Sequence, residues 1–137
     1  MIENFAPGVI ERLGLGYSDI TQVRPEIIML SSAGLGHSGP DMNQVAYGTL
    51  IQCFTGWSSV QGYPNGSPEI GGIWTDPMVG MLEVFLVNSA LYQCWNTGKG
   101  QYIDLSMAEA TTMLLPELIL DYLMNGRIPQ PLSLIHI

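Results

Sequence analysis

The chain has 137 residues and a formal net charge of -8, with 47% hydrophobic and only 12% charged residues. This composition excludes an intrinsically disordered chain, which combines low hydrophobicity with high net charge. Four basic residues against twelve acidic ones argue against a nucleic-acid partner, because the phosphates would meet no cluster of positive charge. Ordinary soluble domains carry about 25% charged residues, so this chain has few groups to keep a free surface in water.

The sequence predicts neither a membrane span nor a secretion signal. A spanning helix needs about 20 consecutive apolar residues, whereas polar residues interrupt both long helical candidates, 78–95 and 113–124. The first residues lack the basic region and apolar core of a signal peptide. Cys53 and Cys94 lie far apart without metal-like spacing, which predicts two reduced, buried thiols. We therefore expect a cytoplasmic protein that binds no metal.

The predicted elements alternate between helix and strand. In chain order they are a helix over 9–13, a helix over 18–23, a strand over 26–32, a glycine-rich loop over 34–40, a helix over 45–54, a turn-rich connection over 56–72, a helix over 77–95, a strand over 101–106 and a helix over 107–124. The continuous apolar run 27–30 is typical of a buried parallel strand, and no strand is expected before residue 4. This alternation predicts an α/β fold with an open parallel sheet.

Asp76 is the first candidate for chemistry. It follows the apolar, glycine-containing stretch 71–74 and directly precedes a predicted helix, where a carboxylate can accept backbone N–H bonds as a cap. The alternative is a nucleophilic carboxylate beside glycines that let a substrate approach the backbone closely. The residue pattern by itself leaves both interpretations open, and capping is the commoner of the two.

The glycine-rich loop over 34–40 is the second candidate. Such a loop after a strand can hold a phosphate or an oxyanion through its backbone N–H groups. It is not the dinucleotide-binding fingerprint, because Pro40 and not a helix follows it. His37 lies in this loop, and a single exposed loop histidine is more often inert than catalytic. The sequence contains no serine nucleophile elbow.

Five motifs stand in a fixed order between residues 4 and 124. They are Asn4-Phe5-x-Pro7-Gly8, Leu13-Gly14-Leu15-Gly16-Tyr17, Pro25-x-Ile27-Ile28, Gly34-x-Gly36-x-x-Gly39-Pro40, and Asp76-Pro77-x-x-Gly80 with the later segment 97–107. Together these motifs resemble the class III CoA-transferases, also called the CaiB/BaiF family. That family includes formyl-CoA transferases, carnitine CoA-transferases and α-methylacyl-CoA racemases.

The resemblance implies a fold and a size. Family members are roughly three times this length and form interlocked homodimers with a Rossmann-like large domain. Residues 1–131 resemble part of that large domain, truncated at both ends. Residues 132–137 match the translation of a sequencing-library adapter, so we expect a non-native tail in which His136 has no function.

The resemblance also implies transfer of CoA from an acyl-CoA to a carboxylic acid. Asp76 stands at the position of the family's catalytic aspartate, which attacks the thioester to give a mixed anhydride and then an aspartyl-CoA thioester. Asn4 and Phe5 match a pair that lies near the adenine and pantetheine of CoA. Arg12 matches an arginine that can meet CoA phosphates, and Met107 matches a methionine that contacts CoA.

Two alternatives remain. Racemases of the family carry a histidine as a second acid/base in the helix after the glycine-rich loop, where this chain has Tyr47. Tyrosine ionises only near pH 10, so it is a poor shuttle for an α-proton at neutral pH, which favours the transferase. The other alternative is that the segment is inactive alone.

Overall fold

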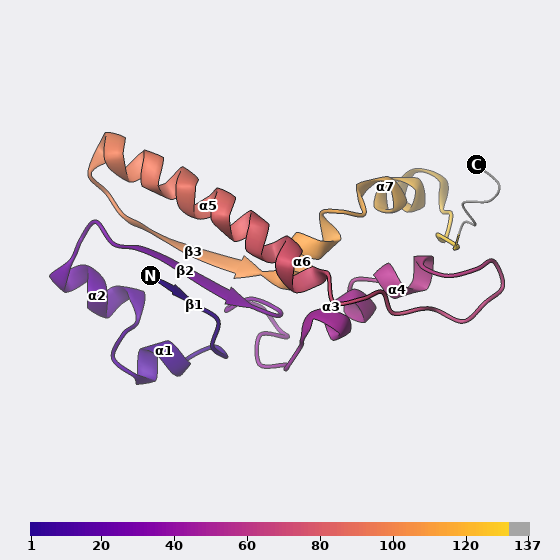
Figure 1. Ribbon diagram of the computed structural model, residues 1–137, viewed down its shortest axis with the longest axis horizontal. Helices are drawn as coiled ribbons and strands as arrows, with labels where there is room; N and C mark the ends of the chain where they lie inside the picture. The colour runs from indigo at the N-terminus through magenta and orange to yellow at the C-terminus, as the bar shows by residue number, and fades with distance from the viewer. Residues whose placement is uncertain (132–137) are drawn as a thin grey trace.

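A computed structural model describes residues 1–131 as a three-stranded parallel sheet with helices on both faces (Figure 1). The elements are β1 (Ile2–Glu3), α1 (Val9–Arg12), α2 (Tyr17–Val23), β2 (Ile28–Ala33), α3 (Gly48–Phe54), α4 (Trp57–Val60), α5 (Thr75–Thr97), β3 (Gln101–Ser106), α6 (Met107–Thr112) and α7 (Pro116–Asn125). The predicted α/β class with a parallel sheet is therefore confirmed.

The strand β2 lies at the centre of the sheet. The order is β1-β2-β3 with both pairings parallel, and Leu30 stands opposite Ile2 on one side and Ile103 on the other. Residues 29–33 are all buried, because helices and neighbouring strands enclose a central parallel strand. The central position of β2 in the sheet explains the apolar run that predicted a buried strand.

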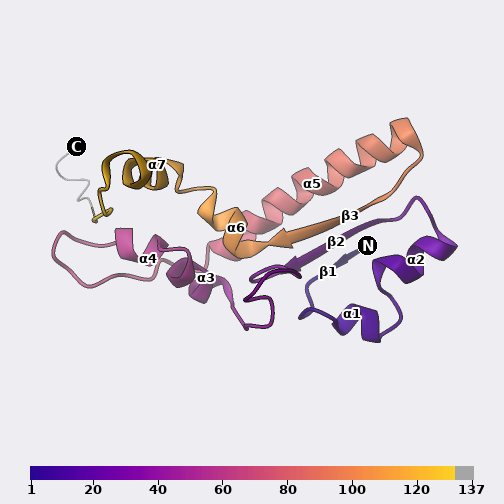
Figure 2. The ribbon, with the colours of Figure 1, turned by 180° about the vertical axis from the view of Figure 1, so that it is seen from behind.

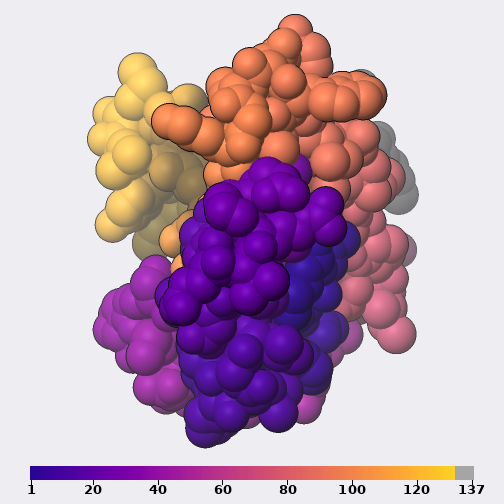
Figure 3. Space-filling view, turned by 90° about the vertical axis from the view of Figure 1, so that its left-hand side faces the viewer, coloured from indigo at the N-terminus to yellow at the C-terminus, as the bar shows by residue number. Residues whose placement is uncertain are grey.

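Helix α5 packs on one face of the sheet, and α1 and α2 lie on the opposite side (Figures 1 and 2). Val79 of α5 forms a buried apolar cluster with Leu105 of β3 and Ala110 of α6. On the other face the rings of Tyr17 and Tyr102 lie 5.4 Å apart. Figure 3 shows α1 and α2, in indigo and purple, below the orange residues that join α5 to β3.

The prediction that no strand precedes residue 4 was wrong. Ile2 and Glu3 pair with β2, and the Met1 amino group donates a hydrogen bond to the Ile28 carbonyl at 2.8 Å. A strand of two residues is too short to show alternation, and only its pairing with β2 defines it.

The helix predicted over 107–124 is two helices. The chain leaves the helical path after Thr112 and starts again at Pro116, because proline lacks an N–H and its ring clashes with the preceding turn. At the start of α6 the Ser106 hydroxyl accepts a hydrogen bond from the Glu109 N–H at 3.3 Å, as a capping serine does.

The segment 45–74 also departs from prediction. Helix α3 begins at Gly48 and not at Val45, and the connection expected to be only turns contains α4. Trp57 of α4 packs edge-on against Trp74, with ring centroids 5.0 Å apart, and donates from Nε1 to the Thr111 carbonyl at 3.3 Å. These contacts hold the connection against α6.

Large apolar side chains remain uncovered on α5 and α7. The exposed set is Met81, Val84, Phe85, Leu91, Tyr92 and Trp95 on α5, and Ile119, Leu120, Tyr122, Leu123 and Met124 on α7. The prediction of two buried thiols was wrong in its burial, since Cys53 is exposed and Cys94 half-buried, although both are free. Within residues 1–131 no helix has the length and apolarity to cross a membrane.

Candidate functional site

A hollow of about 730 Å³ lies where the chain leaves the carboxyl ends of the strands. Asn4 and Phe5, which follow β1, Met107, which follows β3, and Asp76 on α5 all line it. Ligands of open α/β sheets bind at this edge, outside the carboxyl ends of parallel strands. The structure thus brings together four of the five predicted site residues. The fifth, Arg12, is exposed on α1 and does not line the hollow.

Asp76 lies in the first turn of α5, and its carboxylate is exposed. The residue that precedes the helix is Trp74, and no side chain within residues 1–131 caps this terminus. The interpretation of Asp76 as a capping residue was therefore wrong. The positive end of the helix dipole still favours a negative charge at this place, so the carboxylate is both accessible and electrostatically supported.

The Asp76 carboxylate rests against Gly48, the first residue of α3. A Cβ built on Gly48 would overlap Asp76 Oδ2 and would stand 3.0 Å from its Cγ. Real Cβ contacts are not this short, so glycine is the residue that admits the carboxylate here. Two helices that are separated by 20 residues of chain, 55–74, therefore fit together at this point.

Buried hydrogen bonds hold the first turns of α3 and α5 together. Thr75 Oγ1 donates to the Gly48 carbonyl at 3.1 Å. Gln52 Nε2 donates to Thr75 Oγ1 at 3.2 Å and to the Gly72 carbonyl at 3.0 Å. Both Thr75 and Gln52 are fully buried. Neither residue was predicted from the sequence, because a threonine and a glutamine have no local pattern that places them where α3 meets α5.

The glycine-rich loop packs closely on its surroundings. A Cβ on Gly34 would come within 2.7 Å of the Ala46 carbonyl oxygen, so the loop and the segment before α3 touch through their backbones. Gly34 lines the hollow, and its carbonyl accepts from the Ala108 N–H at 3.0 Å. Gly36 has φ +81°, a left-handed conformation that glycine adopts at no steric cost.

His37 is not the exposed loop histidine that the sequence predicts. Its side chain is only 9% exposed and lies between two carboxylates, with Nδ1 3.3 Å from Asp104 Oδ1 and Nε2 3.6 Å from Glu3 Oε1. The His37 backbone N–H also donates to Asp104 Oδ1 at 3.1 Å, and the Phe5 N–H donates to Glu3 Oε2 at 2.8 Å. This cluster links the segment that carries Phe5 to the glycine-rich loop.

Sequence reasoning missed Glu3 and Asp104. Asp104 alternates with apolar neighbours in a strand, which is a pattern that usually places a polar side chain in solvent. Within residues 1–131 no three His, Cys, Asp or Glu side chains are arranged to hold a metal ion.

Tyr102 stands beside this cluster. Partial burial raises the pKa of the Tyr102 phenol, and the negative charges of Asp104, Glu3 and Glu11 raise it further. Both effects disfavour the phenolate, because it would lose water and gain like-charged neighbours.

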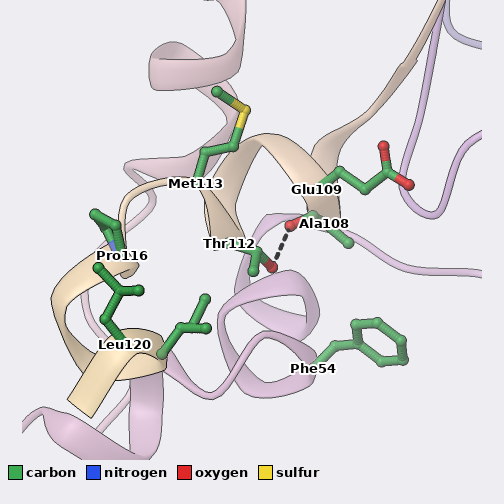
Figure 4. A pocket seen from close by; sticks show the side chains of 8 residues that line it. Phe54, Ala108, Glu109, Thr112, Met113, Pro116 and Leu120 are labelled. Carbon is green, nitrogen blue, oxygen red and sulfur yellow. Dashed lines mark hydrogen bonds between the residues drawn. The ribbon is translucent and has the colours of Figure 1, made fainter. Parts of the chain in front are cut away.

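A second hollow, of about 550 Å³, lies between α3, α6 and α7 (Figure 4). Its lining is mostly apolar and comprises Phe54, Ala108, Glu109, Thr112, Met113, Pro116, Ile119 and Leu120. The Thr112 hydroxyl already donates to the Ala108 carbonyl at 2.8 Å. A binding site needs convergent polar groups as well as apolar walls, so the hollow that contains Asp76 is the better candidate.

Residues 1–136 match the sequence profile of CoA-transferase family III. Over 131 residues the chain is 36% identical to acetyl-CoA:oxalate CoA-transferase of Acetobacter aceti, covering 94% of this chain and 34% of that protein. It is 30% identical over 137 residues to succinate–glutarate CoA-transferase of Agrobacterium fabrum, covering 99% of this chain and 34% of that protein.

A solved structure shows the same fold. The crystal structure of a CaiB/BaiF family protein from Brucella suis matches with a TM-score of 0.90 and 32% sequence identity, covering 96% of this chain and 35% of that chain. The chain spans about a third of the length of the curated relatives it matches. Because the profile match extends over nearly the whole chain, this protein belongs to CoA-transferase family III.

Proposed function

We propose that this segment carries the nucleophile of a CoA-transferase that moves CoA from an acyl-CoA to a carboxylic acid. The relatives are about three times as long, and we call a polypeptide of that length that contains this segment the whole protein. One observation carries the proposal. The Asp76 carboxylate is exposed, does not cap α5, and lies in a hollow that Asn4, Phe5 and Met107 also line. The two named relatives are themselves CoA-transferases.

Asp76 divides the exchange into steps that each have a good leaving group. Its carboxylate attacks the acyl carbonyl carbon of the donor, the C–S bond breaks, and CoA thiolate leaves a mixed anhydride. The thiolate then attacks the Asp76 carbonyl carbon, which releases the donor carboxylate and gives an aspartyl-CoA thioester.

The acceptor carboxylate next attacks this thioester, expelling CoA thiolate and forming a second anhydride. Thiolate attack on the acceptor's acyl carbon gives the new acyl-CoA and restores Asp76. Each attack creates an oxyanion, and backbone N–H groups of the glycine-rich loop at Gly34 are the donors that we assign to stabilise it.

We assign the remaining predicted residues to CoA itself. Asn4, Phe5 and Met107 line the hollow. Asn4 and Phe5 are assigned to the adenine and pantetheine of CoA, and Met107 to a further contact with CoA. Arg12 lies outside the hollow on α1, so its guanidinium is assigned to the phosphates, which it can bind by paired hydrogen bonds. The whole protein works in the cytoplasm as an interlocked homodimer, and the segment is inactive by itself.

The racemase remains the second candidate. Tyr47 lines the hollow at the position where the racemases of the family carry their histidine, and tyrosine is a weak proton shuttle at neutral pH. This residue favours the transferase.

Trapping with hydroxylamine tests the proposal. Whole protein incubated with acyl-CoA and hydroxylamine is expected to carry a hydroxamate on Asp76, detected by peptide mass spectrometry. Asp76→Asn removes the adduct, whereas Glu83→Gln, a change of another carboxylate that lines the hollow, keeps it. Absence of an adduct together with deuterium uptake at the α-carbon of the acyl-CoA would establish the racemase instead.

A further inference from the structure

A relay of buried hydrogen bonds passes through Thr75, the residue before Asp76. It runs from the Gln52 amide to the Thr75 hydroxyl and from that hydroxyl to the Gly48 carbonyl. A branch from the same amide reaches the Gly72 carbonyl. The relay therefore joins α3, the first turn of α5 and the backbone just before α5.

The donors and acceptors of this relay can be assigned in only one way. The Gly72 carbonyl can only accept, so the Gln52 amide must present its NH₂ group there, which settles which amide atom is nitrogen. The second amide N–H then points to Thr75 Oγ1, and the hydroxyl proton of Thr75 goes to the Gly48 carbonyl. Every donor in the relay has a partner.

The relay holds the backbone of both helices next to the contact between Asp76 and Gly48. Thr75 binds the carbonyl of Gly48, while Asp76, the next residue, rests its carboxylate against the Cα of the same glycine. A shift of α5 along α3 would break the hydroxyl bond and move the carboxylate at once. The position of Asp76 is thus coupled to the Thr75 hydroxyl.

The relay also has a cost that packing does not explain. Within residues 1–131, Gln52 Oε1 is buried without a hydrogen-bond partner, and an unsatisfied buried acceptor is destabilising. An apolar side chain of similar size would avoid this loss. The amide at this place is therefore accounted for by the geometry that its two N–H groups fix.

We propose that Thr75 and Gln52 are positioning residues that hold the Asp76 carboxylate for attack, a proposal that rests on the function proposed above. They act through Asp76 and touch neither CoA nor the acyl group. Loss of the Thr75 hydroxyl therefore lowers the rate of the chemical step and leaves the affinity for acyl-CoA unchanged.

The test uses the whole protein with three threonine variants. Thr75→Val keeps the side-chain shape without the hydroxyl, and Thr75→Ser keeps the hydroxyl. Thr111→Val is the matched control, because Thr111 is equally buried and its hydroxyl donates at 2.8 Å only to the Met107 carbonyl of its own helix. We expect kcat to fall at least tenfold in Thr75→Val with KM for acyl-CoA within twofold, and to stay within threefold of wild type in the other two.

Carboxyl labelling gives a readout independent of turnover. With carbodiimide and glycine ethyl ester, the labelling rate of Asp76 relative to Glu83 is expected to change at least twofold in Thr75→Val and to stay constant in Thr111→Val. Gln52→Met, which removes the amide donors, is expected to change this labelling ratio in the same direction. If Thr75→Val does not fold, Gln52→Met tests the positioning proposal in its place.

Two failures are distinguishable. An unchanged kcat or an unchanged labelling ratio in a folded Thr75→Val or Gln52→Met protein overturns the positioning proposal. An equal fall of kcat in Thr111→Val overturns it too, because burial alone would then account for the effect. A wild-type protein that neither transfers CoA nor forms the Asp76 hydroxamate overturns the proposed function, and the labelling ratio still decides the positioning of Asp76.

Discussion

The Asp76 carboxylate lies against the Cα of Gly48, and the contact is closer than any side chain at residue 48 would permit. The two residues come from the first turns of α3 and α5. Glycine is needed here for space, because a methyl group must push the carboxylate away.

Gly48→Ala is therefore expected to lower kcat for CoA transfer more than tenfold in the whole protein. The added Cβ overlaps Asp76 Oδ2, and a displacement of about 1 Å at a reacting group costs about 10²-fold in rate. Gly72→Ala is the control, since a Cβ there meets nothing within 4 Å. Steady-state kinetics measure both, and equal activity of Gly48→Ala and wild type would show that Asp76 needs no such placement.

Glu3→Ala is expected to destabilise the protein and to raise KM for acyl-CoA. The change leaves the Phe5 N–H without its acceptor and removes the carboxylate that faces His37. The lost hydrogen bond contributes about 0.5–1.5 kcal/mol. Urea unfolding and KM measurements check the two effects. Glu26→Ala, whose partner Arg24 is exposed, should change neither, because exposed ion pairs contribute little.

Arg12→Ala is expected to raise KM for acyl-CoA about tenfold with kcat unchanged. A contact to the CoA phosphates is the same in the ground state and the transition state, so its loss weakens binding uniformly. The effect should shrink at high salt, where charges are screened. Arg24→Ala, which removes an exposed charge at the end of α2, is the matched control. A fall of kcat in Arg12→Ala would place the guanidinium at the acyl group instead.

Tyr102 predicts a loss of stability in alkaline solution. Its phenol has a raised pKa in the folded protein, so folding favours the protonated form. The resulting stabilisation is complete below the ordinary value of 10.0 and disappears as the pH rises through the raised value. Tyr102→Phe should flatten the dependence of the free energy of unfolding on pH above 10.0. It should also remove a component of the ultraviolet phenolate titration that lies at high pH, and loss of a component at the ordinary phenol pKa instead would contradict the assignment.

The parts of the fold that were predicted from sequence have strong local patterns. The strand β2 begins within the apolar run 27–30, and α5 continues over 23 residues until Gly98 takes a left-handed conformation. The strand β1 has only two residues and exists through its pairing with β2. The break between α6 and α7 could have been predicted from the sequence, because Pro116 cannot continue a helix.

The candidate site was also predicted only in part, because some of its contacts join residues far apart in the chain. Asn4, Phe5, Asp76 and Met107 were placed by resemblance, and the residue pattern left Asp76 between a cap and a nucleophile. His37 makes its contact with Asp104, which is 67 residues away. The Thr75–Gln52 hydrogen bond likewise joins residues 23 positions apart, and no local pattern encodes such a pairing.

The two indole rings of Trp57 and Trp74 have an optical consequence. They form an edge-on pair, and Trp74 is two residues from Asp76, whereas Trp95 is 91% exposed near the far end of α5. Iodide in solution quenches the fluorescence of Trp95 and reaches the pair less well. Light emitted by the pair therefore reports on the start of α5, and Trp95→Phe leaves the pair as the intrinsic fluorescent probe of this segment.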